Sequence, residues 1–271
     1  MKKLLLLTGT AALLSMTGNA RADDMDITSP FYLPSKNEIL SDTALTFQKM
    51  EFKDAPVAKD FILHEEIDLG IAEQTALRFV LGNRFNFDHF TSQQYNNDLN
   101  LDYEIGMAKN LPLTERLKMQ LRASYYTYDP KSWYGHSRDT KTQIRNRLGS
   151  SRWYKALQGD VKLGYELEDG LMPYATFSVD GNVDSSNRDL GYSAFAGLHK
   201  NEYTFAYDVG LRYEFSTEND DSDSWFMQGS SDYFINDNTT IGGYVDYRFG
   251  GSYTPKVDYG YTLGARFKIR F

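Results

Sequence analysis

The last sixteen residues of the chain, 256–271, alternate between apolar and polar side chains almost without a break. One face carries Val257, Tyr259, Tyr261, Leu263, Ala265, Phe267, Ile269 and Phe271. A period of two is the pattern of a β-strand with one apolar and one polar face. Because soluble strands usually run about 5 to 6 residues, so long a segment with so aromatic a face is typical of a membrane strand.

The first 22 residues have the pattern of a secretory signal peptide. Lys2 and Lys3 precede an apolar run over 4–14, and Ala20-Arg21-Ala22 fits a cleavage site. The apolar run is too short to span about 30 Å of hydrocarbon. We therefore expect a mature chain from Asp23, with no helical span after it. A protein without such a helix can cross a bilayer only as a closed barrel.

Composition narrows the function further. The sequence has 20 Tyr, 17 Phe, 3 Trp and no cysteine, which excludes disulfides, thiolate metal sites and cysteine nucleophiles. The formal net charge of −8 argues against nucleic acid as a partner. We expect no bound cofactor or metal, and the acidic run at 218–223 reads as a solvated loop rather than a Ca²⁺ site.

Alternating segments recur from Leu45 to the last residue, separated by polar or glycine-rich breaks. They predict an all-β fold, a transmembrane antiparallel up-and-down barrel of about 12 strands. The expected strands are 43–52, 61–71, 76–87, 98–108, 116–128, 158–167, 173–181, 190–199, 203–215, 224–234, 239–249 and 257–271.

The lengths of the breaks support this count, because bacterial barrels have short periplasmic turns and longer outer loops. With an upward first strand, the short breaks 72–75, 109–115, 168–172, 200–202 and 235–238 all fall on the periplasmic side. The longer breaks fall outside: 53–60, 88–97, 129–157, 182–189, 216–223 and 250–256. Residues 129–157 lack clean alternation, and they hold either a loop or one more hairpin, which would give 14 strands.

The domain organisation follows from these segments. Residues 1–22 form the signal peptide, 23–41 an N-terminal segment, and 42–271 the barrel. Pro30 and Pro34 argue against a strand in the N-terminal segment, so it either hangs in the periplasm or enters the lumen. Phe31-Tyr32-Leu33-Pro34 is a distinctive run within it that the sequence does not place.

The apolar sets predict the lipid face of each strand, such as Tyr103, Ile105 and Met107 or Val161, Leu163 and Tyr165. Glu65 does not fit, because it shares the parity of the apolar residues around it. A carboxylate facing lipid is unfavourable. Either a bulge shifts the register there, or the hairpin is offset toward the outer surface.

Charges alternate in sign on the opposite, lumenal faces of the early strands. The rows comprise Glu66, Asp68, Arg78, Arg84, Asp102, Glu104, Lys118 and Arg122, and Asp160 and Glu166 on the next strand are acidic again. Such rows either pair across the ladder or select solutes by charge in a water-filled pore. The later strands look lighter, with Thr176, Ser178, Thr204, Gly210, Gln228, Ser230 and Gly242 among the inward residues.

An enzyme would need a nucleophile and a base close together. His64 is expected beside Glu66 in the lumen, His89 and His136 in outer loops, and His199 at a periplasmic strand end. His136 and Ser137 are adjacent in sequence, but adjacency is not the geometry of a triad. We therefore expect no catalytic residues, and an outer-membrane lipid hydrolase or protease stays an alternative.

Taken together, the leader and the closing Phe267-Lys268-Ile269-Arg270-Phe271 give a chain that resembles bacterial outer-membrane β-barrel proteins, most closely the small monomeric porin-like channels. The resemblance implies export to the Gram-negative outer membrane, contact with its lipids and lipopolysaccharide, and recognition of Phe267, Ile269 and Phe271 by the barrel-assembly machinery. The alternating lumenal rows lead us to expect passive diffusion of small polar solutes through a narrow, charge-lined pore. A closed structural or adhesive barrel is the third alternative, and it requires the charged rows to pair fully.

Overall fold

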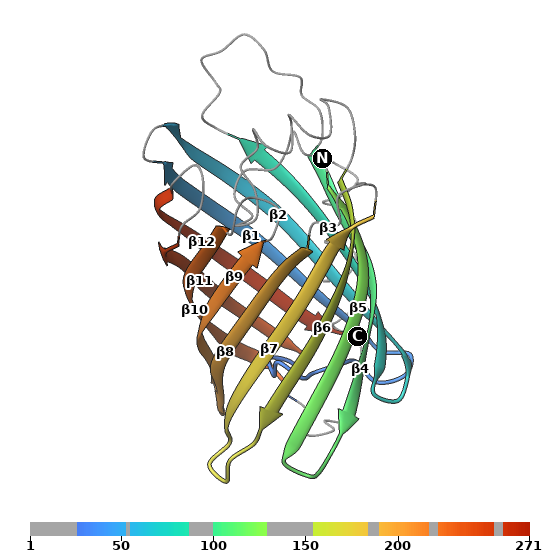
Figure 1. Ribbon diagram of the computed structural model, residues 1–271. Coiled ribbons are helices and arrows are strands. Elements are labelled where there is room, and N and C mark those ends of the chain that lie inside the picture. Colours follow the sequence, from blue (N-terminus) through green and yellow to red (C-terminus); the bar gives the residue numbers. More distant parts are fainter. Residues whose placement is uncertain are drawn as a thin grey trace.

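The computed structural model shows a closed antiparallel barrel whose strands follow one another in sequence order around the wall. It describes residues 26–52, 55–86, 100–128, 154–183, 190–216, 222–251 and 257–271. Figure 1 shows the strands tilted strongly against the barrel axis, as closure of a sheet requires. No helix long and apolar enough to span a bilayer occurs among these residues.

The wall consists of twelve strands, which confirms the expected count. Their bounds are β1 Ile39–Phe52, β2 Ala55–Ala72, β3 Thr75–Asn86, β4 Asn100–Pro112, β5 Leu117–Tyr128, β6 Tyr154–Tyr165, β7 Leu171–Asn182, β8 Leu190–Glu202, β9 Phe205–Ser216, β10 Ser222–Asn236, β11 Thr239–Gly250 and β12 Val257–Arg270. β12 pairs with β1 and closes the sheet. Because β5 pairs directly with β6, the alternative of 14 strands in the wall is wrong.

One connection differs from the expectation. The break predicted at 53–60 is mostly strand, because β2 begins at Ala55 and its ladder to β1 continues through Met50↔Ala58 and Lys49↔Lys59. The apolar alternation stops at this point while the backbone pairing does not, since ladder hydrogen bonds do not depend on side-chain polarity. The sequence pattern therefore marks the apolar band, and the strands extend beyond it.

Five short connections lie at one end of the barrel, where β1 also begins and β12 ends: 73–74, 113–116, 166–170, 203–204 and 237–238. We call this the short-turn end. At the short-turn end the backbone of Phe271 exchanges hydrogen bonds with Ile39, with N···O distances of 2.9 and 3.2 Å. The first and last strands are thus joined up to the final residue.

The outer face of the wall is apolar, as the alternation predicts. Exposed side chains include Leu45, Leu81, Tyr103, Ile105, Met107, Val161, Leu163, Tyr165, Val209, Ile241 and Leu263. Inward positions carry most of the buried polar and charged residues, among them Asp68, Asp160, Glu214, Asp232 and Arg248. This inversion of the usual soluble pattern fits a wall with lipid outside and water inside.

Glu65 keeps the lipid-facing parity, and of the two explanations offered for it, the bulge is not observed at this position. The pairing of β1 with β2 runs in register through Thr43↔Glu65, with its shift only near Met50 and Phe52. The carboxylate accepts hydrogen bonds from the hydroxyls of Ser41, at 2.7 Å, and Thr43 on the same outer face. Two local donors therefore satisfy an acid that the apolar outer surface would otherwise destabilise.

Candidate functional site

The interior of the barrel contains a cavity of about 770 Å³, which we call the lumenal cavity. Among the described residues, seven carboxylates line it, those of Asp42, Glu66, Glu104, Asp208, Glu214, Asp232 and Asp246. Four basic side chains line it as well, those of Arg212, Arg248, Arg266 and Lys268. The lining is thus polar, and carboxylates outnumber Arg and Lys.

Several of these groups pair with one another, within one strand or between strands of the same wall. Arg212 Nε lies 2.9 Å from a carboxylate oxygen of Glu214, and its Nη2 lies 2.8 Å from Asp246. Arg266 donates to both carboxylate oxygens of Asp232. Lys268 and Asp42 are 3.8 Å apart, a looser contact. Such pairs stabilise the wall because charges in a narrow lumen must be hydrated or compensated.

Some carboxylate oxygens of the lining accept no hydrogen bond from these pairs. In the described part of the lining, four such oxygens are buried without a hydrogen-bond partner: Asp42 Oδ1, Glu104 Oε1, Glu214 Oε2 and Asp246 Oδ1. Buried acceptors of this kind are costly unless water, an ion or a solute satisfies them. The lumenal cavity is therefore built to surround polar or positively charged species rather than to be filled by side chains.

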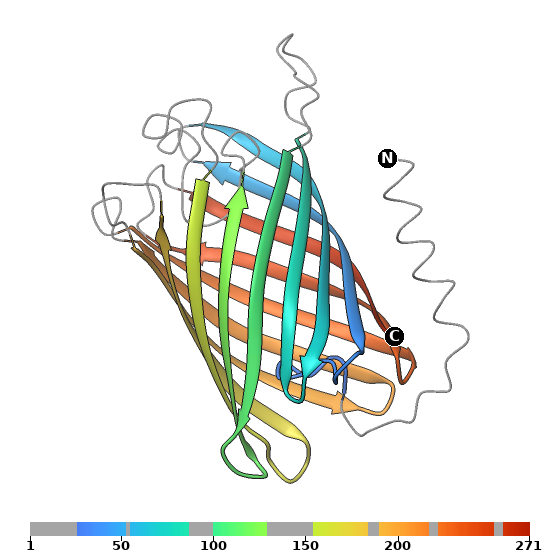
Figure 2. The ribbon, with the colours of Figure 1, turned by 90° about the vertical axis from the view of Figure 1, so that its right-hand side faces the viewer.

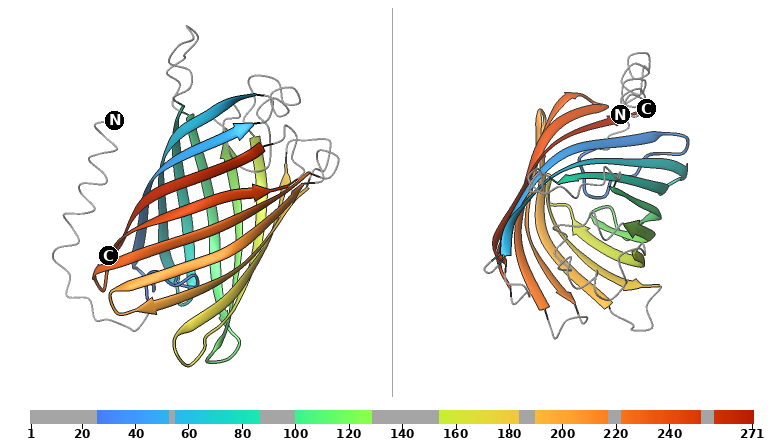
Figure 3. Two further views of the ribbon diagram at one scale, coloured as in Figure 1. Left: turned by 90° about the vertical axis from the view of Figure 1, so that its left-hand side faces the viewer. Right: turned by 90° about the horizontal axis from the view of Figure 1, so that it is seen from above.

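A segment ahead of β1 lies inside the wall at the short-turn end. Residues 26–34, which we call the floor segment, run as irregular chain across the barrel (Figure 2). Their apolar side chains are buried: Ile27 and Tyr32 pack with Leu40 and Phe234, and Leu33 packs with two small residues of the wall, Ala76 and Ala108. The right-hand view of Figure 3, from above, shows this segment, in blue, surrounded by strands of the wall.

Polar side chains of the wall hold the backbone of the floor segment. Asn110 donates its amide to the carbonyl of Phe31 at 2.7 Å, and the Lys162 ammonium donates to the carbonyl of Pro30 at 2.6 Å. The same ammonium lies 5.6 Å from the centre of the Phe31 ring. A coil has no ladder of its own, so these side chains satisfy carbonyls that would otherwise be buried unpaired.

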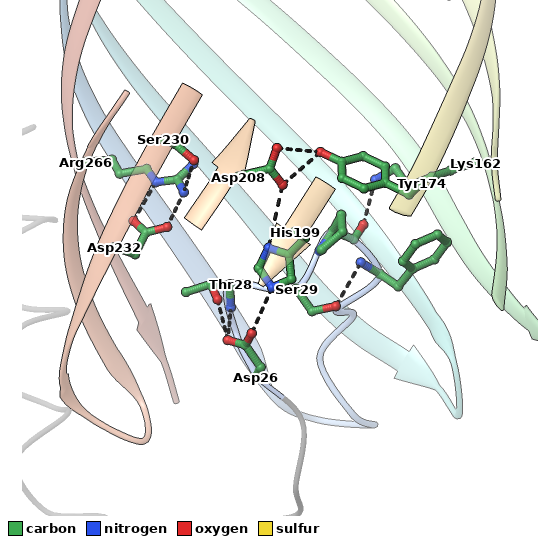
Figure 4. A network of polar contacts seen from close by, with 12 residues as sticks. Asp26, Thr28, Ser29, Lys162, Tyr174, His199, Asp208, Ser230, Asp232 and Arg266 are labelled. Carbon is green, nitrogen blue, oxygen red and sulfur yellow. Dashed lines mark hydrogen bonds and ion pairs between the residues drawn. The ribbon is translucent and has the colours of Figure 1, made fainter. Parts of the chain in front are cut away.

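His199 of β8 ties the floor segment to the lumenal network (Figure 4). Its Nε2 is 3.2 Å from Asp26, and its Nδ1 is 3.6 Å from Asp208. The Tyr174 hydroxyl is 2.8 Å from both carboxylate oxygens of Asp208. Burial alone would raise the pKa of Asp26, but hydrogen bonds from His199 and Thr28 outweigh it and hold that pKa below its usual value.

The floor segment lies between two cavities. Thr28, Ser29 and Pro30 line the lumenal cavity, while Asp26, Ser29, Phe31 and Tyr32 line a second cavity of about 360 Å³ at the short-turn end. Ser29 and His199 line both. The segment is therefore the partition between the lumen and the short-turn mouth. The sequence left open whether it enters the lumen, and in the structure residues 26–34 lie within the wall.

The structure places the charged residues singled out from the sequence mainly in wall pairs. Arg78 makes two 2.8 Å hydrogen bonds to Asp68 and a 2.9 Å ion pair with Glu66. Arg122 pairs with Asp160, and Lys118 with Glu166 at 2.6 Å. Glu66 and Glu104 line the lumenal cavity. The side chains of Arg84 and Asp102 lie outside the described residues, as do His89 and His136.

The later strands carry more charge than the sequence reading assigned to them. Asp208, Arg212, Glu214, Asp232, Asp246 and Arg248 all line the lumenal cavity. The signal was available, because the outward set Phe205, Tyr207, Val209, Leu211 and Tyr213 places the even-numbered residues of β9 inward.

Comparison with known proteins gives matches by structure but not by sequence. No family model matches the chain, and no curated protein matches its sequence. It superposes on an outer membrane channel from Pseudomonas putida F1 with a TM-score of 0.62 at 12% identity, covering 92% of this chain and 100% of that one. For the NanC porin the TM-score is 0.55 at 10% identity, covering 84% and 98% respectively. The chain thus has the fold of bacterial outer-membrane β-barrel proteins.

Proposed function

We propose that this chain is an outer-membrane channel for passive diffusion of small polar solutes, and that its lumen favours cations over anions. The observation that carries the proposal is the lumenal cavity of about 770 Å³ inside a closed wall, lined by seven carboxylates and four Arg or Lys side chains. An excess of one sign in a narrow, low-dielectric passage attracts ions of the opposite sign.

The partial pairing of the lining favours a channel over a closed structural barrel. A closed barrel requires the rows of opposite charge to satisfy one another. Here the wall pairs Arg78 with Asp68 and Arg122 with Asp160, yet Glu104 and Asp42 each retain a buried oxygen that no described residue contacts by a hydrogen bond. The paired side chains therefore support the wall, while the unpartnered oxygens of Glu104 and Asp42 remain to contact solute.

The floor segment sets the narrowest part of the proposed pathway. Solute crossing from the lumenal cavity to the short-turn mouth passes residues 26–34, because Ser29 borders both cavities. Apolar burial of Ile27, Tyr32 and Leu33 holds this segment against the wall. We infer a small conductance limited by the floor segment rather than by the diameter of the barrel.

Conductance in planar bilayers tests the proposal. Purified, refolded protein should give small, discrete current steps, and a KCl gradient should give a reversal potential of the cation-selective sign. Removing positive charge from the wall, by neutral replacement of Arg78, Arg84, Lys118 and Arg122, should shift the reversal potential further toward cations. Folded protein that passes no ion current at any voltage would refute a channel, and an unchanged reversal potential would assign those four residues to wall structure alone.

The enzyme alternative gains no support from the described histidines. His64 and His199 both face the interior, where they line the lumenal cavity. A lipid-cleaving site requires its base on the outer rim, within reach of membrane lipid. The pair His136 and Ser137 lies outside the described residues, and replacement of His136 by Ala tests it directly in a lipid-hydrolysis assay.

We also propose that the chain is exported and assembled as an outer-membrane protein, in contact with lipopolysaccharide. The support is the leader pattern of residues 1–22 together with the seam formed by β12. Phe267, Ile269 and Phe271 share the parity of the exposed Leu263 on that last strand, and we expect a barrel-assembly machinery to read them during assembly. Deleting Phe271 should lower the amount of folded barrel in outer-membrane fractions, whereas normal assembly would argue against this signal.

A further inference from the structure

Two neighbouring aromatic rings, Tyr174 and Phe195, line the inner wall of the lumenal cavity, and we call them the platform. The Tyr174 and Phe195 rings have centroids 5.3 Å apart and planes inclined by 39°. Phe195 lies against the backbone of Gly197 and Gly210, where an added Cβ would come within 2.5 and 2.4 Å of its ring atoms. Only glycine at these two positions allows the ring to lie on the wall, so that its other face is turned to the cavity.

Carboxylates surround this platform on the strands that follow. The Tyr174 hydroxyl is bound to Asp208 on β9. Glu214 is opposite Ser193 in the β8–β9 register, and Arg212 is opposite Phe195, which makes Glu214 a diagonal neighbour of the Phe195 ring. Glu214 is only 9% exposed, and its Oε2 has no partner among the described residues.

Arg212, the basic side chain opposite Phe195 in the register, is already engaged. Arg212 contacts Glu214 and Asp246, and its guanidinium carbon lies 4.3 Å from the centre of the Phe226 ring. Asp246 on β11 still retains one oxygen, Oδ1, without a hydrogen-bond partner in the described part of the chain. Asp208, Glu214 and Asp246 thus bring three carboxylates to the platform, and Arg212 together with His199, 3.6 Å from Asp208, offsets only part of their negative charge.

We propose that the Tyr174–Phe195 platform, with Glu214, Asp208 and Asp246, is a binding site for organic cations that carry an alkylammonium group. Aromatic faces attract cations through the negative potential of the ring, and a nearby unpaired carboxylate adds charge attraction in a partly desolvated cavity. A neutral sugar would also stack on a ring, but it gains nothing from the excess of negative charge. The inference deepens the proposed cation-preferring channel and rests on it for biological meaning.

Choline chloride is a suitable probe, with glucose as the neutral comparison. Isothermal titration of the full-length folded barrel in detergent micelles should show choline binding that is saturable and glucose binding that is far weaker. Replacing Phe195 by Leu should weaken choline binding about tenfold, the size of a partly desolvated cation–π contact. Replacing Phe195 by Tyr, which keeps a ring, should restore it.

Matched controls separate the site from general effects. Glu214→Gln should also weaken choline binding about tenfold, whereas Glu168→Gln makes the same charge change on an exposed turn (84% exposed) and should not. Phe177→Leu removes a lipid-facing ring (51% exposed) and should leave choline affinity unchanged. Equal binding of choline and glucose, or unaltered affinity in both Phe195→Leu and Glu214→Gln, would overturn the site.

The binding measurement is independent of ion conduction, so the two proposals fail separately. Choline binding with the expected variant pattern, in a barrel that passes no current, would keep the site and refute the channel. Current without choline binding would keep the channel and refute the site. If the Phe195→Leu barrel does not fold, Glu214→Gln and Phe195→Tyr still decide the outcome.

Discussion

A single methyl group on the wall should loosen the floor segment. Gly164 of β6 faces the Phe31 ring, and a Cβ added there would lie 2.4 Å from Cε2 and 2.7 Å from Cζ. Ordinary contacts begin at 3.4 Å, so Gly164→Ala forces the ring to move by about 1 Å. That movement disturbs the edge contact of Phe31 with Tyr174, whose ring centroids are 6.5 Å apart.

Overpacking of this kind typically costs about 1 to 3 kcal/mol. The Asn110 and Lys162 hydrogen bonds hold the carbonyls of residues 30 and 31 in place, so the ring has little freedom to adjust without releasing them. If the strain falls on the seated floor segment alone, the ratio of unseated to seated states rises about tenfold for each 1.4 kcal/mol. The mutant should therefore show more frequent transitions to a larger conductance.

Single-channel recording measures this effect, and the same strand supplies the control. Gly159 is also in β6, but a Cβ added there meets nothing within 4 Å. Gly159→Ala should therefore give the same conductance and opening frequency as the parent protein. Both variants must first be shown to fold. An identical conductance and opening frequency in Gly164→Ala and Gly159→Ala would refute the view that Phe31 packing holds the pathway narrow.

Two further predictions concern the stability of the wall. Arg78→Met should destabilise the folded barrel by about 3 kcal/mol, because it leaves the buried carboxylate of Asp68 unpaired. Urea titration of the refolded protein measures this loss of stability. Combining Arg78→Met with Asp68→Leu should recover much of the lost stability. On the outer face, Ser41→Ala with Thr43→Val should cost about 1 to 3 kcal/mol by removing both donors to Glu65. In a Glu65→Leu background the same pair should cost little, and an equal cost in the two backgrounds would contradict the role given to these hydroxyls.

The wall was predictable because its signal is local. Alternation along each strand determines which side chains face lipid, and the closing of β12 on β1 follows from the need to satisfy edge groups in a bilayer. The opposite signs of Asp68 and Arg78, or of Arg122 and Asp160, likewise predicted pairs that the register brings together. Strand ends were less predictable, since β2 continues beyond the apolar band at Ala55.

The floor segment and the aromatic platform were not predictable from the sequence alone. Residues 26–34 have no period, and the place of a coil is decided by distant partners such as Asn110, Lys162 and His199. The platform depends on Gly197 and Gly210, two small residues on different strands that become neighbours only through the register. Sequence patterning can assign a residue to the inner face, but it cannot say what lies beside that residue on the next strand.

The seating of the floor segment imposes an order on the maturation of the barrel. Tyr32 packs on Leu40 of β1 and lies 5.9 Å below the guanidinium of Arg270 on β12, so its site is composed of both sides of the seam. An open sheet, in which these two strands are still apart, has only half of that site. β1 and β12 must therefore pair before the floor segment can pack inside the barrel, and a packed floor segment indicates that closure is complete.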